Sequence, residues 1–130
     1  MSGDYLLDTN IVIALFAGEA LVLQGLTKAE KIFIPCVVIG ELYYGAHRSG
    51  RRDANLARID QFVVINTILN CDAETARHYG VIKDALHCKG CPLPENDLWI
   101  AALARQHRLT LITRDAHFSY IPDLALESWS

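Results

Sequence analysis

Four acidic residues lie beside or inside apolar runs, where solvated carboxylates are not usually found: Asp8, Glu41, Asp97 and Asp115. Helical spacing directs the side chains of Asp97 and Glu41 toward the interior, because each shares a helical face with apolar neighbours. A buried carboxylate without a partner is costly, and two carboxylates about 4 Å apart repel each other by about 4 kcal/mol at an effective dielectric constant of about 20. If the four acids meet, they must therefore bind a cation or take up protons.

The donor atoms indicate which cation this site would hold. Carboxylate oxygens without His or Cys favour Mg²⁺ or Mn²⁺ over zinc. Such an ion lowers the pKa of a bound water and holds the attacking and leaving oxygens of a phosphate ester. Phosphodiester hydrolysis is therefore the predicted chemistry, whereas acyl transfer lacks a convincing Ser–His pair in this sequence.

Each acid also has a plainer interpretation. The helix dipole favours an acid such as Asp97 in the first turn of a helix, and Glu41 could be a solvated residue on a broad apolar face. Asp8 could cap the helix that follows it, and Asp115 could cap a short turn. Thr113 could donate its hydroxyl to the site or only extend a strand. These alternatives stay open for each residue taken alone.

The elements that would position the acids alternate between short apolar runs and longer helical stretches, which predicts an α/β domain with a short, mainly parallel sheet of four to five strands. Strands are predicted at 5–7, 32–34, 62–65, 110–112 and 125–127, and helices at 11–16, 35–46, 51–59, 72–87 and 96–107. Asp72 is a predicted cap of the fourth helix, and Asn96 could cap the fifth. Ligands bind beyond the carboxyl ends of parallel strands. Since Asp8 follows the first strand and Asp115 the fourth, one sheet edge can gather the acids.

Size and composition predict one domain over residues 1–130, with a core but a negative formal net charge of −3. That charge argues against a protein that coats nucleic acid generally. No apolar run approaches the roughly 18 residues of a membrane span, and no signal peptide is evident. We therefore expect no membrane partner and a cytoplasmic location. The 52% hydrophobic content suggests a covered subunit or partner surface.

The four cysteines fall into two pairs of different kinds. Cys36 and Cys71 are isolated in sequence and are predicted to be small, reduced core residues. Cys88 and Cys91 have the spacing of metal ligands, but a second such pair is absent from the sequence. A plain or redox-sensitive loop is therefore favoured over a zinc site there.

In four segments the sequence resembles PIN-domain ribonucleases, specifically VapC-type toxins of type II toxin–antitoxin pairs: 6–10 (LLDTN), 40–46 (GELYYGA), 94–102 (PENDLWIAA) and 113–118 (TRDAHF). One such segment is weak, but the four in this order, in a chain of this length, are specific. The resemblance implies a PIN-like α/β/α sandwich, endonucleolytic RNA cleavage with Mg²⁺ or Mn²⁺, a homodimer and a cognate antitoxin.

The resemblance also assigns roles to residues. It implies that the four acids are metal ligands or water-activating residues, and that four neighbours are supporting polar groups: Thr9, Asn10, Asn96 and Thr113. The arginines that follow the Glu41 helix are predicted to meet RNA phosphates, or else form a solvated flank: Arg48, Arg51 and Arg52.

Other classes fit less well. An aspartate-nucleophile phosphotransferase needs a second Asp where this chain has Asn10, and a phospho-receiver domain needs a lysine after a late strand, which is absent. A PIN nuclease that is not a toxin, and a non-catalytic PIN-fold module that binds RNA or protein, stay open as alternatives.

Overall fold

A sheet of five short parallel strands forms the centre of the molecule, a computed structural model that describes residues 3–130. The strands are β1 (Asp4–Leu7), β2 (Lys31–Pro35), β3 (Thr67–Leu69), β4 (Thr110–Ile112) and β5 (Leu126–Glu127). They are arranged in the order β3-β2-β1-β4-β5, and each neighbouring pair is parallel. The predicted parallel sheet is confirmed.

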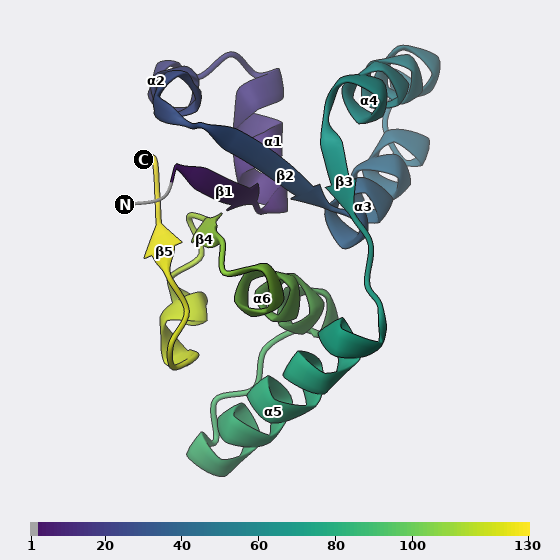
Figure 1. Ribbon diagram of the computed structural model, residues 1–130. Helices are drawn as coiled ribbons and strands as arrows, with labels where there is room; N and C mark the ends of the chain where they lie inside the picture. Colours follow the sequence, from purple (N-terminus) through teal and green to yellow (C-terminus); the bar gives the residue numbers. More distant parts are fainter. Residues whose placement is uncertain (1–2) are drawn as a thin grey trace.

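Six α-helices and one 3₁₀ helix cover this sheet within the described residues: α1 (Thr9–Phe16), α2 (Ala20–Lys28), α3 (Cys36–His47), α4 (Arg52–Ile65), α5 (Ala73–Lys89), α6 (Glu95–His107) and the 3₁₀ helix η1 (Ala116–Tyr120). In Figure 1, α1 and α2 lie above the sheet and α5 and α6 lie below it. The structure is therefore the expected α/β/α sandwich, the PIN-like arrangement of helices and strands.

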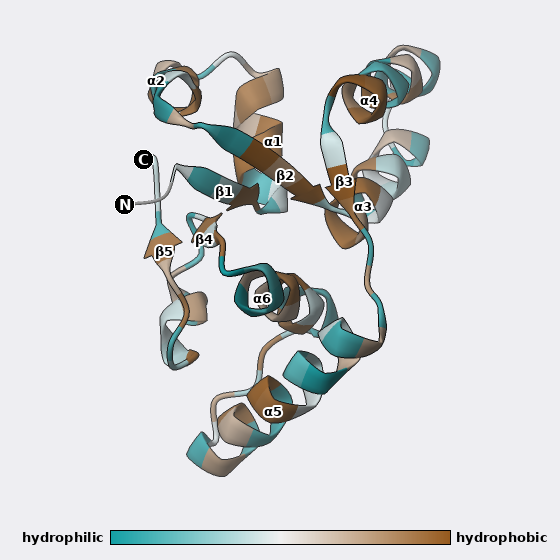
Figure 2. Cartoon of the chain, in the orientation of Figure 1, coloured by the Kyte–Doolittle hydropathy of each residue, from teal (hydrophilic) through white to brown (hydrophobic). Residues whose placement is uncertain are grey.

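The core follows from burial of the central strands on both faces. Leu6 and Leu7 of β1 and Leu111 and Ile112 of β4 are completely buried, as strands covered by helices on both sides require. Each such side chain contributes about 1.5–3 kcal/mol through its removal from water. Figure 2 shows β1 and β2 changing from hydrophilic at their starts to hydrophobic at their carboxyl ends. The polar residues that follow these ends therefore begin at the boundary of the core.

The prediction of a strand at 62–65 is wrong, because this segment is the last turn of α4. Phe62 is buried and contacts the Phe16 ring edge-to-face, with 5.2 Å between ring centroids. Ile59, one turn earlier, is also buried, so apolar residues at helical spacing face α1 and α3. The third strand is the three-residue β3 directly after this helix.

Other differences concern helix starts. Helix α2 was not predicted from the sequence. Helix α6 begins at Glu95 with Pro94 as its N-cap and without a side-chain cap bond, so the expected cap at Asn96 is wrong. Pro35 ends β2 and precedes α3, where the sequence predicted that it would open the helix. The predicted cap at Asp72 is confirmed.

Within residues 3–130 no single helix is long and apolar enough to cross a membrane; only α1 and α2 taken together, bent by 110° at their junction, pass by length and composition.

Candidate active site

Asp8 is the most deeply placed of the four acids, because it stands between the end of β1 and the start of α1. Its side chain is 5% exposed. One carboxylate oxygen accepts a hydrogen bond from the Thr9 backbone N–H at 2.8 Å, and the other accepts from the Thr113 hydroxyl at 2.7 Å and the Asn10 amide at 3.3 Å. Burial nevertheless raises the pKa of Asp8, and the nearby carboxylates of Glu41 and Asp115 add to this effect.

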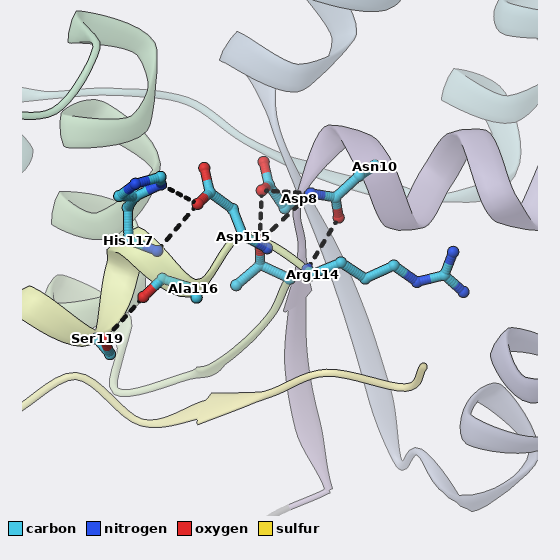
Figure 3. Close-up of polar contacts among 8 residues, drawn as sticks. Asp8, Asn10, Arg114, Asp115, Ala116, His117 and Ser119 are labelled. Atoms are coloured by element: carbon cyan, nitrogen blue, oxygen red, sulfur yellow. Dashed lines mark hydrogen bonds and ion pairs between the residues drawn. The ribbon is translucent and has the colours of Figure 1, made fainter.

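Asp115 reaches the same place from the loop after β4. Figure 3 shows its carboxylate and that of Asp8 projecting to the same side of this loop. The Thr113 hydroxyl accepts from the Asp115 backbone N–H at 3.0 Å, and Asn10 accepts from the Arg114 backbone N–H at 3.3 Å. These bonds fix the loop against the start of α1. They show that Thr113 and Asn10 join the two segments, as expected of supporting polar groups.

The carboxylate of Asp115 also caps η1. It accepts from the His117 backbone N–H at 2.9 Å, and the His117 ring nitrogen Nδ1 lies 2.7 Å from the same oxygen. The backbone bond, followed by the ring contact, lowers the pKa of Asp115. The capping interpretation of Asp115 is therefore correct, and it does not prevent the residue from facing the other acids.

Glu41 joins the cluster from α3, one and a half turns after the helix begins. The Thr9 hydroxyl donates to its carboxylate at 2.6 Å. Both residues line one end of a cavity of about 190 Å³ between α1, α3 and α4, whose other walls are mostly apolar. The side chain of Glu41 is half-buried. The sequence correctly predicted that it faces inward, although it does not enter the core.

Asp97 lies in the first turn of α6 and has the most unusual electrostatic environment in the site. Burial, followed by the charges of Asp8, Asp115 and Glu41, raises its pKa to about 6, and only His117 opposes this. Three separate carboxylates therefore act on one half-buried acid. The structure brings the four predicted acids to one edge of the sheet, at the carboxyl ends of β1 and β4.

The site is not a ready-made coordination shell. Within residues 3–130, no three His, Cys, Asp or Glu side chains already stand in a metal-holding arrangement, either here or at the cysteine pairs. The donor set nevertheless fits a hard divalent cation, because all of its donor atoms are oxygens. Such an ion would also relieve the repulsion between Asp97 and the other three carboxylates. Small side-chain movements would have to accompany its binding.

The remaining predicted residues lie outside this network. Asn96 is exposed, and no hydrogen bond joins its side chain to the acids in the described part of the chain. Arg48, Arg51 and Arg52 are exposed around the turn between α3 and α4, with the Arg52 Nε donating to His47 at 3.1 Å. The structure leaves their roles as predictions.

Sequence reasoning did not assign a role to His117, although it contacts Asp115 and lowers the pKa of Asp97. Its position two residues after an acid at a strand end was the available signal. In a 3₁₀ turn, the side chain of such a residue comes back beside the carboxylate that caps the turn.

Known proteins match this chain over almost all of the residues that form the fold. The family model for the PIN domain matches residues 5–124. The ribonuclease VapC2 of Haemophilus influenzae is 37% identical over 128 residues, which cover 96% of this chain and 97% of that protein. This chain belongs to the PIN-domain family of VapC ribonucleases.

Other VapC proteins agree over a similar length. The tRNA(fMet)-specific endonuclease VapC of Shigella flexneri is 35% identical over 129 residues, covering 97% of this chain and 98% of that one. Among solved structures, VapBC2 from Rickettsia felis, bound to a DNA fragment from its promoter, superposes with a TM-score of 0.90 at 32% identity over 98% of this chain and 99% of that one. The predicted fold and family resemblance are confirmed.

Proposed function

We propose that this chain is the toxin of a type II toxin–antitoxin pair and that it hydrolyses RNA phosphodiester bonds at the four-acid site with Mg²⁺ or Mn²⁺. The observation that carries the proposal is the convergence of three carboxylates on Asp97, whose pKa burial and these charges together raise to about 6. A structural acid would instead be surrounded by donors. The family relationship to VapC ribonucleases supports the same conclusion.

In this proposal the four acids hold the cation, and their neighbours hold the acids. When bound, the ion lowers the pKa of a water and neutralises charge on the phosphate. Thr113 and Asn10 orient Asp8, and Thr9 orients Glu41. These bonds fix oxygen positions before the ion arrives, which is the role of outer partners at metal sites.

Asp97 is the acid best suited to receive a proton from the attacking water. In the metal-free protein, burial and the charges of the other three acids raise its pKa to about 6. A general base works best when its pKa is near the working pH, and such catalysis contributes about 10²–10⁴-fold. Asn96, exposed beside it, is retained as a supporting polar group of the site.

The test is cleavage of RNA by purified protein with Mg²⁺, Mn²⁺ or EDTA. The Shigella relative is named for initiator tRNA, so that tRNA and a mixed cellular RNA pool are suitable substrates. We expect cleavage by the wild type only with metal, and a fall of about 10²–10⁴-fold in Asp97→Asn. The matched control is Asp72→Asn, an acid at the start of the neighbouring helix, which should cleave like the wild type. Cleavage in EDTA, or an undiminished Asp97→Asn, would contradict the mechanism.

The proposal of an antitoxin partner rests on the relatives. The Rickettsia felis structure and that of VapBC-1 from Haemophilus influenzae contain a VapB together with a VapC. We therefore propose a cognate antitoxin for this chain, and we retain the toxin homodimer that the family resemblance implies. Expression alone should arrest growth in an Asp97-dependent manner, and co-expression of the antitoxin should restore it. Cleavage without growth arrest would favour a PIN nuclease that is not a toxin, and metal-independent RNA binding alone would favour a non-catalytic module.

We assign RNA phosphate contacts to Arg48, Arg51 and Arg52, which form an exposed basic turn next to the Glu41 helix. Each phosphate contact contributes roughly 0.7–0.9 to the slope of log binding constant against log salt. Arg51→Ala with Arg52→Ala should therefore flatten the slope by about 1–2 in binding assays without divalent metal. Arg77→Ala, on the distant helix α5, is the matched control. An unchanged slope would remove the assignment.

A further inference from the structure

Two cysteines far apart in sequence leave neighbouring strands at the same sheet edge. Cys36 is the first residue of α3, directly after β2, and Cys71 follows β3 by two residues. The two strands are parallel, with Pro35 opposite Leu69, and paired strands lie about 4.8 Å apart. Figure 1 shows β2 and β3 ending side by side. This pairing therefore brings the two residues close together at one edge of the sheet.

The two thiols also interact. Burial, followed by the charge and hydrogen-bonding capacity of Cys36, raises the pKa of Cys71 to about 11. Both cysteines are free, Cys36 is partly exposed, and Cys71 is exposed. The expectation that Cys71 is a core residue is therefore wrong. What the structure contains instead is a pair of adjacent, reduced thiols that solvent and small reagents can reach.

The other two cysteines are separate from this pair. Cys88 and Cys91 lie at the far end of α5, whose 17 residues correspond to a length of about 25 Å. The thiol of Cys91 contacts the Lys89 carbonyl at 3.6 Å. This length excludes a disulfide between Cys71 and either Cys88 or Cys91. The second pair is therefore an internal control with the same residue type and similar exposure, since Cys88 is exposed and Cys91 is partly exposed.

We propose that Cys36 and Cys71 are a modification site, at which a small-molecule disulfide such as oxidised glutathione closes a reversible protein disulfide. The raised pKa of Cys71 keeps that thiol protonated, so the Cys36 thiolate attacks a sulfur of the reagent, breaks its S–S bond and releases one reduced glutathione. Cys71 then gives up its proton and attacks the Cys36 sulfur of the mixed disulfide, which releases the second glutathione. Two electrons pass from the cysteines to the reagent, and the two thiol protons end on the released glutathiones.

Closure would join the start of α3 to the segment that leads from β3 into α5. Cys36 begins the helix that carries Glu41, and Cys71 precedes Asp72, whose carboxylate accepts from Gln106 of α6 at 3.0 Å. The bond would enclose roughly 35 residues of chain and reduce the freedom of the unfolded state. We expect a rise in Tm of roughly 5 °C or more. Reducing agent should reverse this rise completely. The inference does not depend on RNA cleavage.

The experiment treats the full-length Cys88→Ser/Cys91→Ser protein with oxidised glutathione. Intact mass should fall by about 2 Da without a lasting glutathione adduct, and peptide mapping should find one cross-linked peptide pair containing Cys36 and Cys71. Adding Cys71→Ser should leave a mixed disulfide on Cys36 and no rise in Tm. Peptide mapping of the untreated and treated wild type provides the same result if a variant fails to fold. Free thiols, or two stable glutathione adducts, would overturn the proposal.

Discussion

Asp72 and Asp97 are the same residue type, at the starts of two helices that pack together, yet their pKa values move in opposite directions. Asp72 accepts from the Thr75 backbone N–H and from the Gln106 amide, both at 3.0 Å, and the first of these bonds contributes most to lowering its pKa. Asp97 has burial and three carboxylates around it, which raise its pKa to about 6. The groups that face an acid, more than its place on a helix, therefore decide whether it is structural.

This difference explains why the start of one helix has a structural role and the start of the other belongs to the candidate site. Around Asp72 the donors satisfy the charge, so the residue stabilises the fold and has little capacity left for a ligand. Around Asp97 the like charges leave an electrostatic cost that a bound cation would offset. Helix α6 also begins without a side-chain cap, so Asp97 is not used for its own helix.

Among changes that leave the four acids in place, the largest effect should come from removing the donor that holds Asp8. Thr113→Val keeps the shape but deletes the hydroxyl that donates to Asp8 at 2.7 Å and accepts from the Asp115 backbone N–H. Loss of such an outer partner costs about 10–100-fold in metal affinity or activity. Cleavage rates measured against Mg²⁺ concentration should show this loss.

The control for this change is Thr75→Val, because the Thr75 hydroxyl occupies the equivalent place beside Asp72. That variant should lose stability while retaining cleavage per folded molecule. Equal activity losses in both variants would mean that the two helix starts differ less than their electrostatics indicate.

A smaller effect is expected from Asp72→Ala, which removes the capping box of α5 and the bond to α6. Loss of an N-cap of this kind should lower Tm by roughly 3–6 °C. Thermal unfolding followed by circular dichroism measures the change. Asp72→Asn should recover much of it, since an amide oxygen also accepts the backbone bond. RNA cleavage at a temperature where both variants are folded should match the wild type, and a loss there would assign Asp72 to the site.

The sequence predicted that the four acids gather at one sheet edge, because local patterns reveal which side of a helix is apolar and where a strand ends. Asp97 was placed by the apolar stripe that follows it, and Asp8 by its position directly after a buried strand. The error at 62–65 has a different origin, since a short apolar run fits a strand or a buried helix turn equally well. Packing of Phe62 against Phe16, a contact between distant segments, decided it.

The missed features of the site have the same origin. The role of His117 depends on a 3₁₀ turn that returns its ring to Asp115, and no periodic pattern marks such a turn. Outside the site, the proximity of Cys36 and Cys71 depends on the pairing of β2 with β3. The sequence could not place that contact while the third strand was expected five residues too early.

The smallest effect, the pH dependence of stability without metal, tests the electrostatic cost at Asp97 directly. Its pKa rises from the ordinary 3.8 to about 6 in the folded protein, so the folded state binds the proton more tightly than the unfolded state. Stability must therefore fall as pH rises from about 4 to about 6, and the loss persists above that range. The full shift corresponds to nearly 3 kcal/mol, but the side chain is half-exposed and solvent screening reduces the cost to about 1 kcal/mol.

Asp97→Asn cannot ionise, so in EDTA it should be about 1 kcal/mol more stable than the wild type at pH 8, with the difference disappearing near pH 4. Urea unfolding at several pH values measures this difference. Added Mg²⁺ should stabilise the wild type and leave the variant nearly unchanged, because the ion binds the folded state through the missing charge. A variant that is less stable than the wild type at pH 8 would show that donors, rather than carboxylates, dominate around Asp97, and the contrast with Asp72 would then be lost.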